Sequence, residues 1–387
     1  MAIKILSVDD EVDLEVLLSQ YFRRKIRHGE YEFFFAHNGI EALEELLKHP
    51  DIEIILSDIN MPEMDGLTLL SKINEMRNPA QKCIMVSAYG DLGNIRTAMN
   101  NGAFDFATKP IDLDDLQRTI DNAVKQIEFI KSSQKEHAEL EDIHNDLEAA
   151  RSIQHAILPR NFVVNVENAS SIDLHASMVT AKEVGGDFYD FFRIDDNHMG
   201  FTLADVSGKG VPASLFMAVS RTMIKAYGST GVSSRECMEK VNDLLSEESL
   251  NSMFVTTFYG ILDTRNGHID YTNAGHNNPY VVRADGSVTP LPSERNIALG
   301  AIGGMSYRSN ELTLEHGDLL YMYTDGVTEA EDIDHGQYGE SRLEEVLASL
   351  AGSTSKTIVE TINEKVKEFT GEAVQSDDIT QLSIKRI

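Results

Sequence analysis

Cysteine is scarce in this sequence, with only Cys83 and Cys237 among 387 residues. Two cysteines are too few for a disulfide framework, and their spacing is not that of a zinc site. Long apolar runs are also missing, because none approaches the roughly 20 residues of a membrane-spanning helix. The start of the chain leads into acidic residues rather than into the apolar core of a signal peptide. We therefore expect a soluble, cytoplasmic protein without a membrane partner.

Basic residues are also in short supply: 34 Lys and Arg stand against 63 Asp and Glu, which gives a net charge of −29. Binding to nucleic acid needs clustered positive charge, so this balance argues against a nucleic-acid partner. No helix-turn-helix pattern supports a transcription factor. An acidic body favours proteins, metal ions or small cationic ligands instead. With 42% hydrophobic residues, the chain is long enough for two or three globular domains.

Short apolar runs alternate with amphipathic helical patterns in the first domain, predicted over residues 1–122. This alternation predicts an α/β fold with a doubly wound parallel sheet, whose ligands bind at the carboxyl ends of the strands. The strands are expected at residues 3–8, 31–36, 52–57, 83–87 and 104–107. The helices are expected at residues 11–27, 40–47, 66–76, 91–100 and from residue 112 onward.

Polar residues stand at the expected strand ends of this domain: Asp9, Asp10, Asp58, Ser87 and Lys109. If the three carboxylates meet within about 4 Å, each pair repels by roughly 1 kcal/mol in water and about 4 kcal/mol at an effective dielectric of 20. The cluster therefore needs a cation, and all-oxygen ligands select Mg²⁺. The lysine and serine would complete a cradle for a phosphoryl group on Asp58, a carboxylate acting as nucleophile.

The first domain resembles the receiver domain of bacterial two-component response regulators. The resemblance rests on the stretch Asp-Ile-Asn-Met-Pro-Glu-Met-Asp-Gly at residues 58–66 and on Lys109-Pro110. It implies that a sensor histidine kinase is the partner and that Asp58 is the phosphoacceptor. It also implies the remaining roles: Asp9 and Asp10 as the acidic Mg²⁺ pair, Asn60 as a carbonyl ligand, and Ser87 and Phe106 as switch residues.

Glycine is absent from residues 113–158, and no proline appears there until Pro159. Apolar residues recur in two groups with a polar interruption, so residues 123–158 are predicted as a helical linker with an interrupted heptad seam. One interpretation is an amphipathic helix packed on its own domain. We favour a parallel two-stranded coiled coil, and hence a homodimer, because a lone helix of this length has little to bury against. The seam residues are Ile120, Val124, Ile127, Ile130, Leu140, Ile143, Leu147, Ala150 and Ile157.

Residues 159–387 mix strand-like runs with a few helices, which predicts an α/β sandwich rather than alternating units. Acidic residues again adjoin strands: Asp205, Asp325 and the pair Asp377-Asp378. Without cysteine or suitably spaced histidine, such a site favours Mg²⁺ or Mn²⁺ over zinc. Two such ions can hold a hydroxide in line with a phosphorus atom. Hydrolytic phosphoryl chemistry is therefore expected.

This domain resembles the metal-dependent serine/threonine protein phosphatases, in their bacterial branch of sporulation and general-stress enzymes. The motifs are residues 150–159, Gly185-Gly186-Asp187 with the three residues that follow, residues 273–276, and residues 377–380. The resemblance implies two Mn²⁺ or Mg²⁺ ions. Asp205 would bridge the two ions. Asp187 and the Val206 carbonyl would complete the coordination of one ion, and Asp325 and Asp377 that of the other. Asp378 is a weaker candidate than Asp377.

Two further residues of this domain have alternative interpretations. Lys209 could contact the phosphate or be a solvated loop lysine, and both remain open. His276 could be a general acid, but a structural hydrogen-bonding role is favoured because metal-activated water needs no separate base.

The leading hypothesis is a response regulator whose output is a protein phosphatase. Phosphorylation of Asp58 would control hydrolysis of phosphoserine or phosphothreonine, and the resemblance implies a phosphorylated anti-sigma-factor antagonist as substrate. The alternative is a non-catalytic adaptor whose phosphatase-like domain binds a sigma factor or its regulator. Retention of the four aspartates of the second site argues against the adaptor, because a binding module does not need mutually repelling carboxylates.

Overall fold

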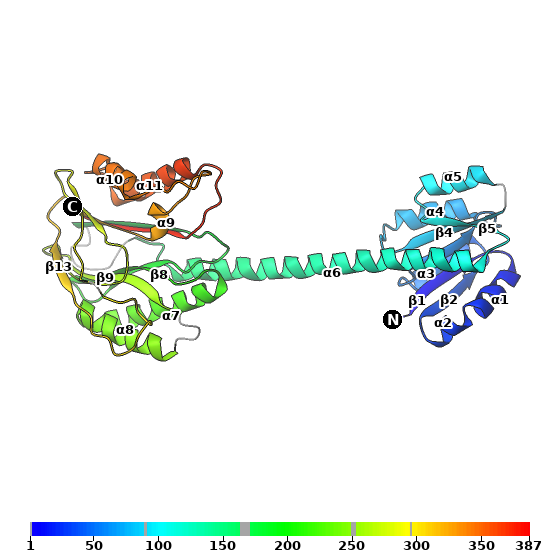
Figure 1. Ribbon diagram of the computed structural model, residues 1–387, viewed down its shortest axis with the longest axis horizontal. Helices are drawn as coiled ribbons and strands as arrows, with labels where there is room; N and C mark the ends of the chain where they lie inside the picture. Colours follow the sequence, from blue (N-terminus) through cyan, green and yellow to red (C-terminus); the bar gives the residue numbers. More distant parts are fainter. Residues whose placement is uncertain (1, 89–90, 163–170, 249–252, 295) are drawn as a thin grey trace. The chain divides into compact units, whose positions relative to one another are not determined.

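The computed structural model describes residues 2–88, 91–162, 171–248, 253–294 and 296–387. The chain divides into two compact units, Met1–Ile143 and His144–Ile387, and helix α6 (Leu113–Ile157) contributes to both (Figure 1). None of the helices in the described ranges combines the length and the apolar character that crossing a lipid bilayer requires.

The first unit contains a five-stranded parallel sheet with the strand order β2-β1-β3-β4-β5. Successive side chains of a strand point to opposite faces, so the apolar runs supply two cores. Ile5, Ile54 and Ile84 belong to one core, and their neighbours Leu6, Ile55 and Met85 to the other. The predicted doubly wound parallel sheet is confirmed. Its strands are β1 (Ile3–Val8), β2 (Tyr31–Ala36), β3 (Ile54–Asp58), β4 (Lys82–Ala88) and β5 (Asp105–Lys109).

Five helices connect these strands: α1 (Val12–Tyr21), α2 (Arg23–Arg27), α3 (Gly39–Lys48), α4 (Gly66–Glu75) and α5 (Leu92–Asn100). The prediction of one continuous helix over residues 11–27 is wrong in detail. Phe22 leaves the helical conformation with ψ near 4° and buries its ring against Tyr31 and Phe33. Aromatic packing into the core therefore divides the segment.

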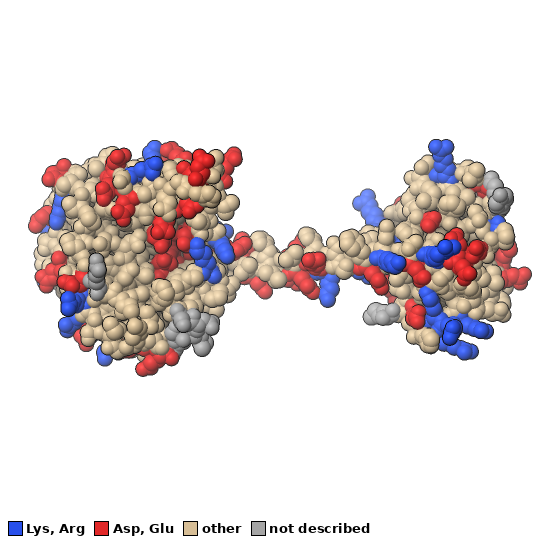
Figure 2. Space-filling view, in the orientation of Figure 1, with Lys and Arg blue, Asp and Glu red and all other residues tan. Residues whose placement is uncertain are grey.

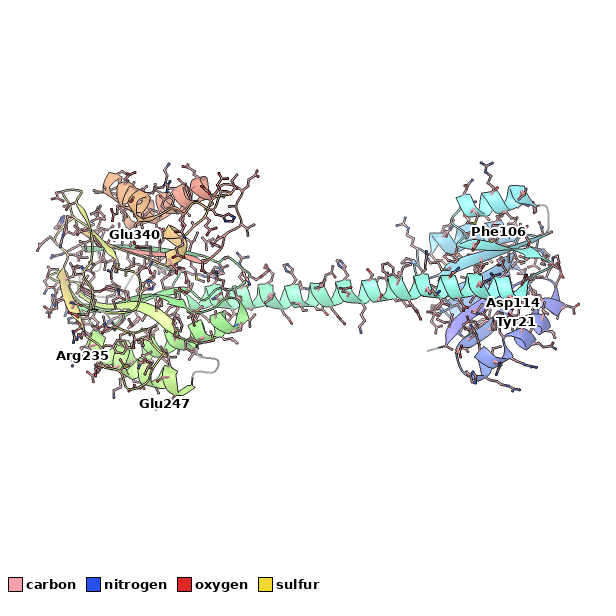
Figure 3. All side chains as sticks on the ribbon, viewed as in Figure 1. Tyr21, Phe106, Asp114, Arg235, Glu247 and Glu340 are labelled. Atoms are coloured by element: carbon pink, nitrogen blue, oxygen red, sulfur yellow. The ribbon has the colours of Figure 1, made fainter. Side chains whose placement is uncertain are left out.

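The first turns of α6 belong to the core of the first unit, where Leu116, Ile120, Ala123 and Ile127 are buried. Polar contacts add to this packing, since the Tyr31 hydroxyl donates to Asp121 at 2.9 Å. Figure 3 shows Tyr21 of α1 beside Asp114 of α6, and the tyrosine hydroxyl donates to that carboxylate. Helix α6 is thus anchored where it begins.

The middle of α6 is exposed in the part of the chain that the structure describes, and its Lys131 pairs with Glu53 of the first unit. Every residue of the stretch 131–146 is exposed, and the apolar Leu140 and Ile143 are 59% and 56% exposed. Among the charged side chains visible along the connecting helix in Figure 2, acidic ones outnumber basic ones.

The second unit is built from two five-stranded antiparallel sheets, with the orders β13-β10-β9-β8-β7 and β12-β11-β14-β15-β6. Helices α7 and α8 pack on the first sheet, and α10 and α11 on the second. The predicted α/β sandwich is confirmed. The first sheet consists of β7 (Phe188–Arg193), β8 (His198–Val206), β9 (Val255–Asp263), β10 (His268–Ala274) and β13 (Asn310–Thr313). The second consists of β6 (Ile172–Val179), β11 (Tyr280–Val282), β12 (Val288–Pro290), β14 (Leu319–Tyr323) and β15 (Ile379–Arg386). The helices are α7 (Val211–Gly228), α8 (Ser234–Glu248), α9 (Asp325–Thr328), α10 (Glu340–Ser349) and α11 (Ser355–Thr370).

Candidate functional site

Three carboxylates meet at the carboxyl edge of the parallel sheet. Asp9 follows β1, Asp58 ends β3, and one ligand oxygen from each of Asp9, Asp10 and Asp58 lies within 4.8 Å of the others. Asp9 and Asp58 are buried, whereas Asp10 is exposed. Burial raises the pKa of Asp9 above its usual range. A hard divalent cation fits this all-oxygen set. Asn60 follows Asp58 by two residues, lies on the loop after β3 and is exposed.

Lys109 closes the same group from the end of β5. Its Nζ lies 2.9 Å from Asp9 Oδ2, 2.9 Å from Asp58 Oδ2 and 3.0 Å from Glu11 Oε1. Burial alone would lower the pKa of Lys109, but these three carboxylates outweigh it and raise that pKa. The lysine stays charged at neutral pH and can balance negative charge on Asp58.

Ser87 and Phe106 lie on the neighbouring strands β4 and β5. Ser87 is fully buried, and its Oγ has no hydrogen-bond partner among the residues that the structure describes. A buried hydroxyl without a partner is costly unless a ligand supplies one. A phosphoryl oxygen on Asp58 would do so. Phe106, labelled in Figure 3, is 39% exposed.

Acidic residues also converge in the second unit, at one end of the sandwich. Asp187 precedes β7, Asp205 lies near the end of β8, and Asp325 begins α9. The Thr324 hydroxyl donates to Asp187 Oδ2 at 2.8 Å. Burial, and then the charge of Asp325, raises the pKa of Asp205 to about 7. Burial and the charges of Asp205 and Asp378 raise the pKa of Asp187.

Two glycines allow backbone and carboxylates to approach closely beside Asp187. A Cβ on Gly186 would lie 3.0 Å from the Val206 carbonyl oxygen, and a Cβ on Gly185 would lie 2.1 Å from Asp378 Oδ2. No side chain fits at Gly185 without displacing that carboxylate. We call residues 185–187 the glycine loop.

The adjacent aspartates 377 and 378 have different surroundings. Asp378 is buried, with Oδ1 accepting from the Ala181 amide at 2.8 Å and Oδ2 accepting from the Gly186 amide at 2.8 Å. These bonds hold the glycine loop in place. Asp377 is more exposed, and its Oδ2 lies 3.0 Å from Lys209 Nζ. Lys209 also donates to the Ser376 carbonyl at 2.6 Å.

His276 is buried, with Nδ1 lying 3.0 Å from the Thr256 hydroxyl. Its amide donates to Asn273 Oδ1 at 2.8 Å, and the Asn273 side chain donates back to the His276 carbonyl. Burial lowers the pKa of His276 to about 4. At pH 7 the ring is then the neutral imidazole, which can donate a hydrogen bond but is too weak an acid to protonate a leaving group, so these contacts favour the structural interpretation.

The donor set of this second site suits hard divalent ions. The carboxylates of Asp187, Asp205, Asp325 and Asp377 and the carbonyl of Val206, predicted as ligands, offer oxygen atoms only, and such donors match Mg²⁺ or Mn²⁺. The raised pKa values of Asp187, Asp205 and Asp325 reflect burial and mutual repulsion. A bound cation would relieve that repulsion.

Sequence reasoning missed two residues that support this site. Gln154 of α6 is buried and makes two hydrogen bonds with the backbone of Gly185. Arg221 of α7 pairs with the buried Asp190 of β7 at 2.8 Å. Residues 150–159 were recognisable as a motif, but nothing in the sequence says that Gln154 faces the glycine loop.

Family comparison identifies both parts of the chain. Residues 5–121 match the response regulator receiver domain, and residues 195–387 match stage II sporulation protein E. Among curated proteins, IcfG of Synechocystis sp. is 28% identical over 62% of this chain and 41% of its own length. The phosphoserine phosphatase RsbU of Bacillus subtilis is 26% identical over 64% of this chain and 71% of its own length.

Among solved structures, the SiaA-PP2C domain of Pseudomonas aeruginosa is similar, with a TM-score of 0.56 and 25% identity. That match covers 65% of this chain and 99% of the SiaA domain.

Proposed function

Because the chain joins a response regulator receiver domain to a PP2C-type protein phosphatase domain of the stage II sporulation protein E family, we propose that it is a phosphorylation-controlled, metal-dependent protein phosphatase. A sensor histidine kinase would phosphorylate Asp58. The C-terminal domain would then change its rate of hydrolysis of phosphoserine or phosphothreonine. The substrate would be an anti-sigma-factor antagonist in a partner-switching pathway.

The geometry around Asp58 supports its role as phosphoacceptor. Its Oδ1 accepts from the Ile59 amide at 2.7 Å and its Oδ2 pairs with Lys109, which fixes the carboxylate for attack on phosphorus. Asp9, Asp10 and Asn60 would hold a Mg²⁺ ion. Lys109 and the unpartnered Ser87 hydroxyl would bind the phosphoryl oxygens.

The observation that supports the phosphatase proposal is that the carboxylates of Asp187, Asp205, Asp325 and Asp377 lie near enough that their charges, after burial, raise the pKa values of the first three. Two Mn²⁺ or Mg²⁺ ions bound there would activate a water for attack on phosphorus. Asp205 would hold both ions. Asp187 with the Val206 carbonyl, and Asp325 with Asp377, would complete the two sites.

The partner assignments have separate support. The similarity to a phosphoserine phosphatase supports a phosphoserine substrate. Exposure of Leu140 and Ile143 on α6 supports a homodimer, because pairing of two helices would bury these side chains.

The experiment is to incubate the purified protein with Mn²⁺ and a phosphorylated antagonist and to follow phosphate release. Asp205→Asn should lower the rate by several orders of magnitude, because the carboxylate shared by both ions is lost. The matched control is Asp285→Asn, which changes an exposed loop aspartate in the same domain. Activity that survives both chelation and Asp205→Asn would show that the proposed metal site does not catalyse the release, and no release by the wild type would favour the adaptor.

A further inference from the structure

A cavity of about 450 Å³ lies in the second unit, and we call it the α11 cavity. It is bounded by the C-terminal part of α11, the loop of residues 371–377, the end of β6 and the start of β15. This volume is within the range of ligand-binding pockets, and it accommodates a large apolar side chain. The apolar part of the lining consists of Val179, Ala330, Val366, Ala373 and Ile379.

Hydrogen bonds hold the loop that forms one wall of the α11 cavity. Gln375 Nε2 donates to the Val179 carbonyl at 2.9 Å and to the Asp377 carbonyl at 2.7 Å. Lys209 donates to the carbonyl of Ser376. These bonds tie the loop both to β6 and to the candidate metal ligand Asp377. Because the wall is already ordered, an occupant does not have to order it on binding.

The α11 cavity is continuous with the candidate metal site. Asp377 lines the cavity and is also a predicted metal ligand. Gly326, another lining residue, directly follows the predicted ligand Asp325. A molecule whose phosphate reaches the metal site can therefore place a neighbouring group in the cavity.

Exposed apolar side chains beside the α11 cavity favour a protein as the occupant. Val374 stands between the lining residues Ala373 and Gln375 and is 90% exposed, and Val179 is 45% exposed. A small molecule inside the cavity would leave Val374 in water, whereas a protein docked over the loop would cover it. Apolar side chains that fill pockets commonly supply much of the binding energy of such contacts.

We propose that the α11 cavity receives an apolar side chain of the phosphoprotein substrate, from a residue close to the phosphorylated serine on the substrate surface. The inference rests on the proposed function, because it places the phosphate of that substrate at the acidic site. The cavity binds the protein part of the substrate and touches no reacting atom. It therefore determines which phosphoproteins are bound, and not how fast a bound phosphate is hydrolysed.

The test fills the α11 cavity by Ala373→Phe in the full-length protein and compares two substrates. One is the phosphorylated anti-sigma-factor antagonist, and the other is p-nitrophenyl phosphate, which is too small to occupy the metal site and the cavity together. We expect the KM for the phosphoprotein to rise about tenfold, with its kcat and the hydrolysis of p-nitrophenyl phosphate unchanged. The matched control Ala301→Phe adds the same ring to an exposed loop of the same domain and should change neither substrate's kinetics.

The outcomes separate this inference from the proposed function. If the wild type releases no phosphate from the phosphoprotein, the proposed function is wrong. If the wild type is active and Ala373→Phe keeps the same KM for the phosphoprotein, the α11 cavity is not a substrate site. If folded Ala373→Phe loses activity equally toward both substrates, the loop acts only by holding Asp377, and the inference is overturned.

A second variant covers the case in which Ala373→Phe fails to fold. Val179→Ser removes apolar surface from the cavity wall and keeps the backbone carbonyl that accepts from Gln375. The KM for the phosphoprotein should rise about threefold, again without a change in the hydrolysis of p-nitrophenyl phosphate. An unchanged KM in this variant would overturn the inference.

Discussion

At the residue scale, both candidate sites depend on carboxylates held close together by particular neighbours. Strand-end aspartates could be predicted from the sequence, because an acid directly after an apolar run falls at the edge of a sheet. The roles of Gln154 and Asp378 could not. Both depend on side chains that meet the glycine loop from elements far away in sequence.

The first residue-scale prediction concerns Asp58. Asp58→Asn should abolish phosphate incorporation from acetyl phosphate, because the amide is a poor nucleophile and loses the charge that pairs with Lys109. Phosphate-affinity electrophoresis measures the incorporation. The control Asp51→Asn alters an exposed aspartate of the same domain and should leave phosphate incorporation unchanged. Wild-type incorporation in Asp58→Asn would show that the phosphoacceptor lies elsewhere.

The second concerns His276 and pH. Its pKa is about 4 in the folded protein and 6.5 in the unfolded chain, so folding favours the neutral imidazole. The contribution of the neutral imidazole to stability is complete when the pH is above the pKa of the unfolded chain. It is lost as the pH falls toward the pKa of the folded protein. When the pH falls from about 7.5 to about 5, the titration of His276 should lower the free energy of unfolding by about 2 kcal/mol.

Urea unfolding of the wild type and His276→Asn at several pH values measures this loss. The variant lacks the titrating group, so the stability difference between the two proteins should shrink by that amount as the pH falls. A difference that stays constant with pH would contradict the buried, neutral imidazole.

At the element scale, the periodicity of the sequence made the receiver strands and α6 predictable, whereas β7 gives no such signal. β7 has the sequence Phe-Tyr-Asp-Phe-Phe-Arg and is buried on both faces, so it lacks the alternation that marks a strand. Its buried Asp190 is tolerated because Arg221 of α7 supplies the opposite charge. A partner from another helix cannot be found from local sequence.

The element-scale prediction tests helix phase in α6. Inserting seven residues of matching heptad near Ser133 preserves the facing of a paired seam, whereas inserting two rotates the downstream part by about 200°. The longer insertion should keep phosphatase activity responsive to Asp58 phosphorylation. The two-residue insertion should hold phosphatase activity at one level whether or not Asp58 is phosphorylated, with both domains still folded. Phosphate release with and without beryllium fluoride is the measurement, and equal regulation in both variants would identify α6 as a flexible tether.

At the scale of the whole molecule, helix α6 contributes to both units, and each unit carries one of the two candidate sites. Leu116 and Ile120 bury the start of α6 in the receiver core, and Gln154 attaches its end to the glycine loop. The exposed middle stretch leaves the helix free to pair with a second copy. Under the proposed function, a change in the receiver would reach the phosphatase domain through this helix.

The most direct test of this account is Mn²⁺-dependent phosphate release from a phosphorylated anti-sigma-factor antagonist, measured with and without beryllium fluoride. Beryllium fluoride should change the wild-type rate at least about fivefold and leave the rate of Asp58→Asn unchanged. No Mn²⁺-dependent release in either state, or an equal change in Asp58→Asn, would contradict the proposed function.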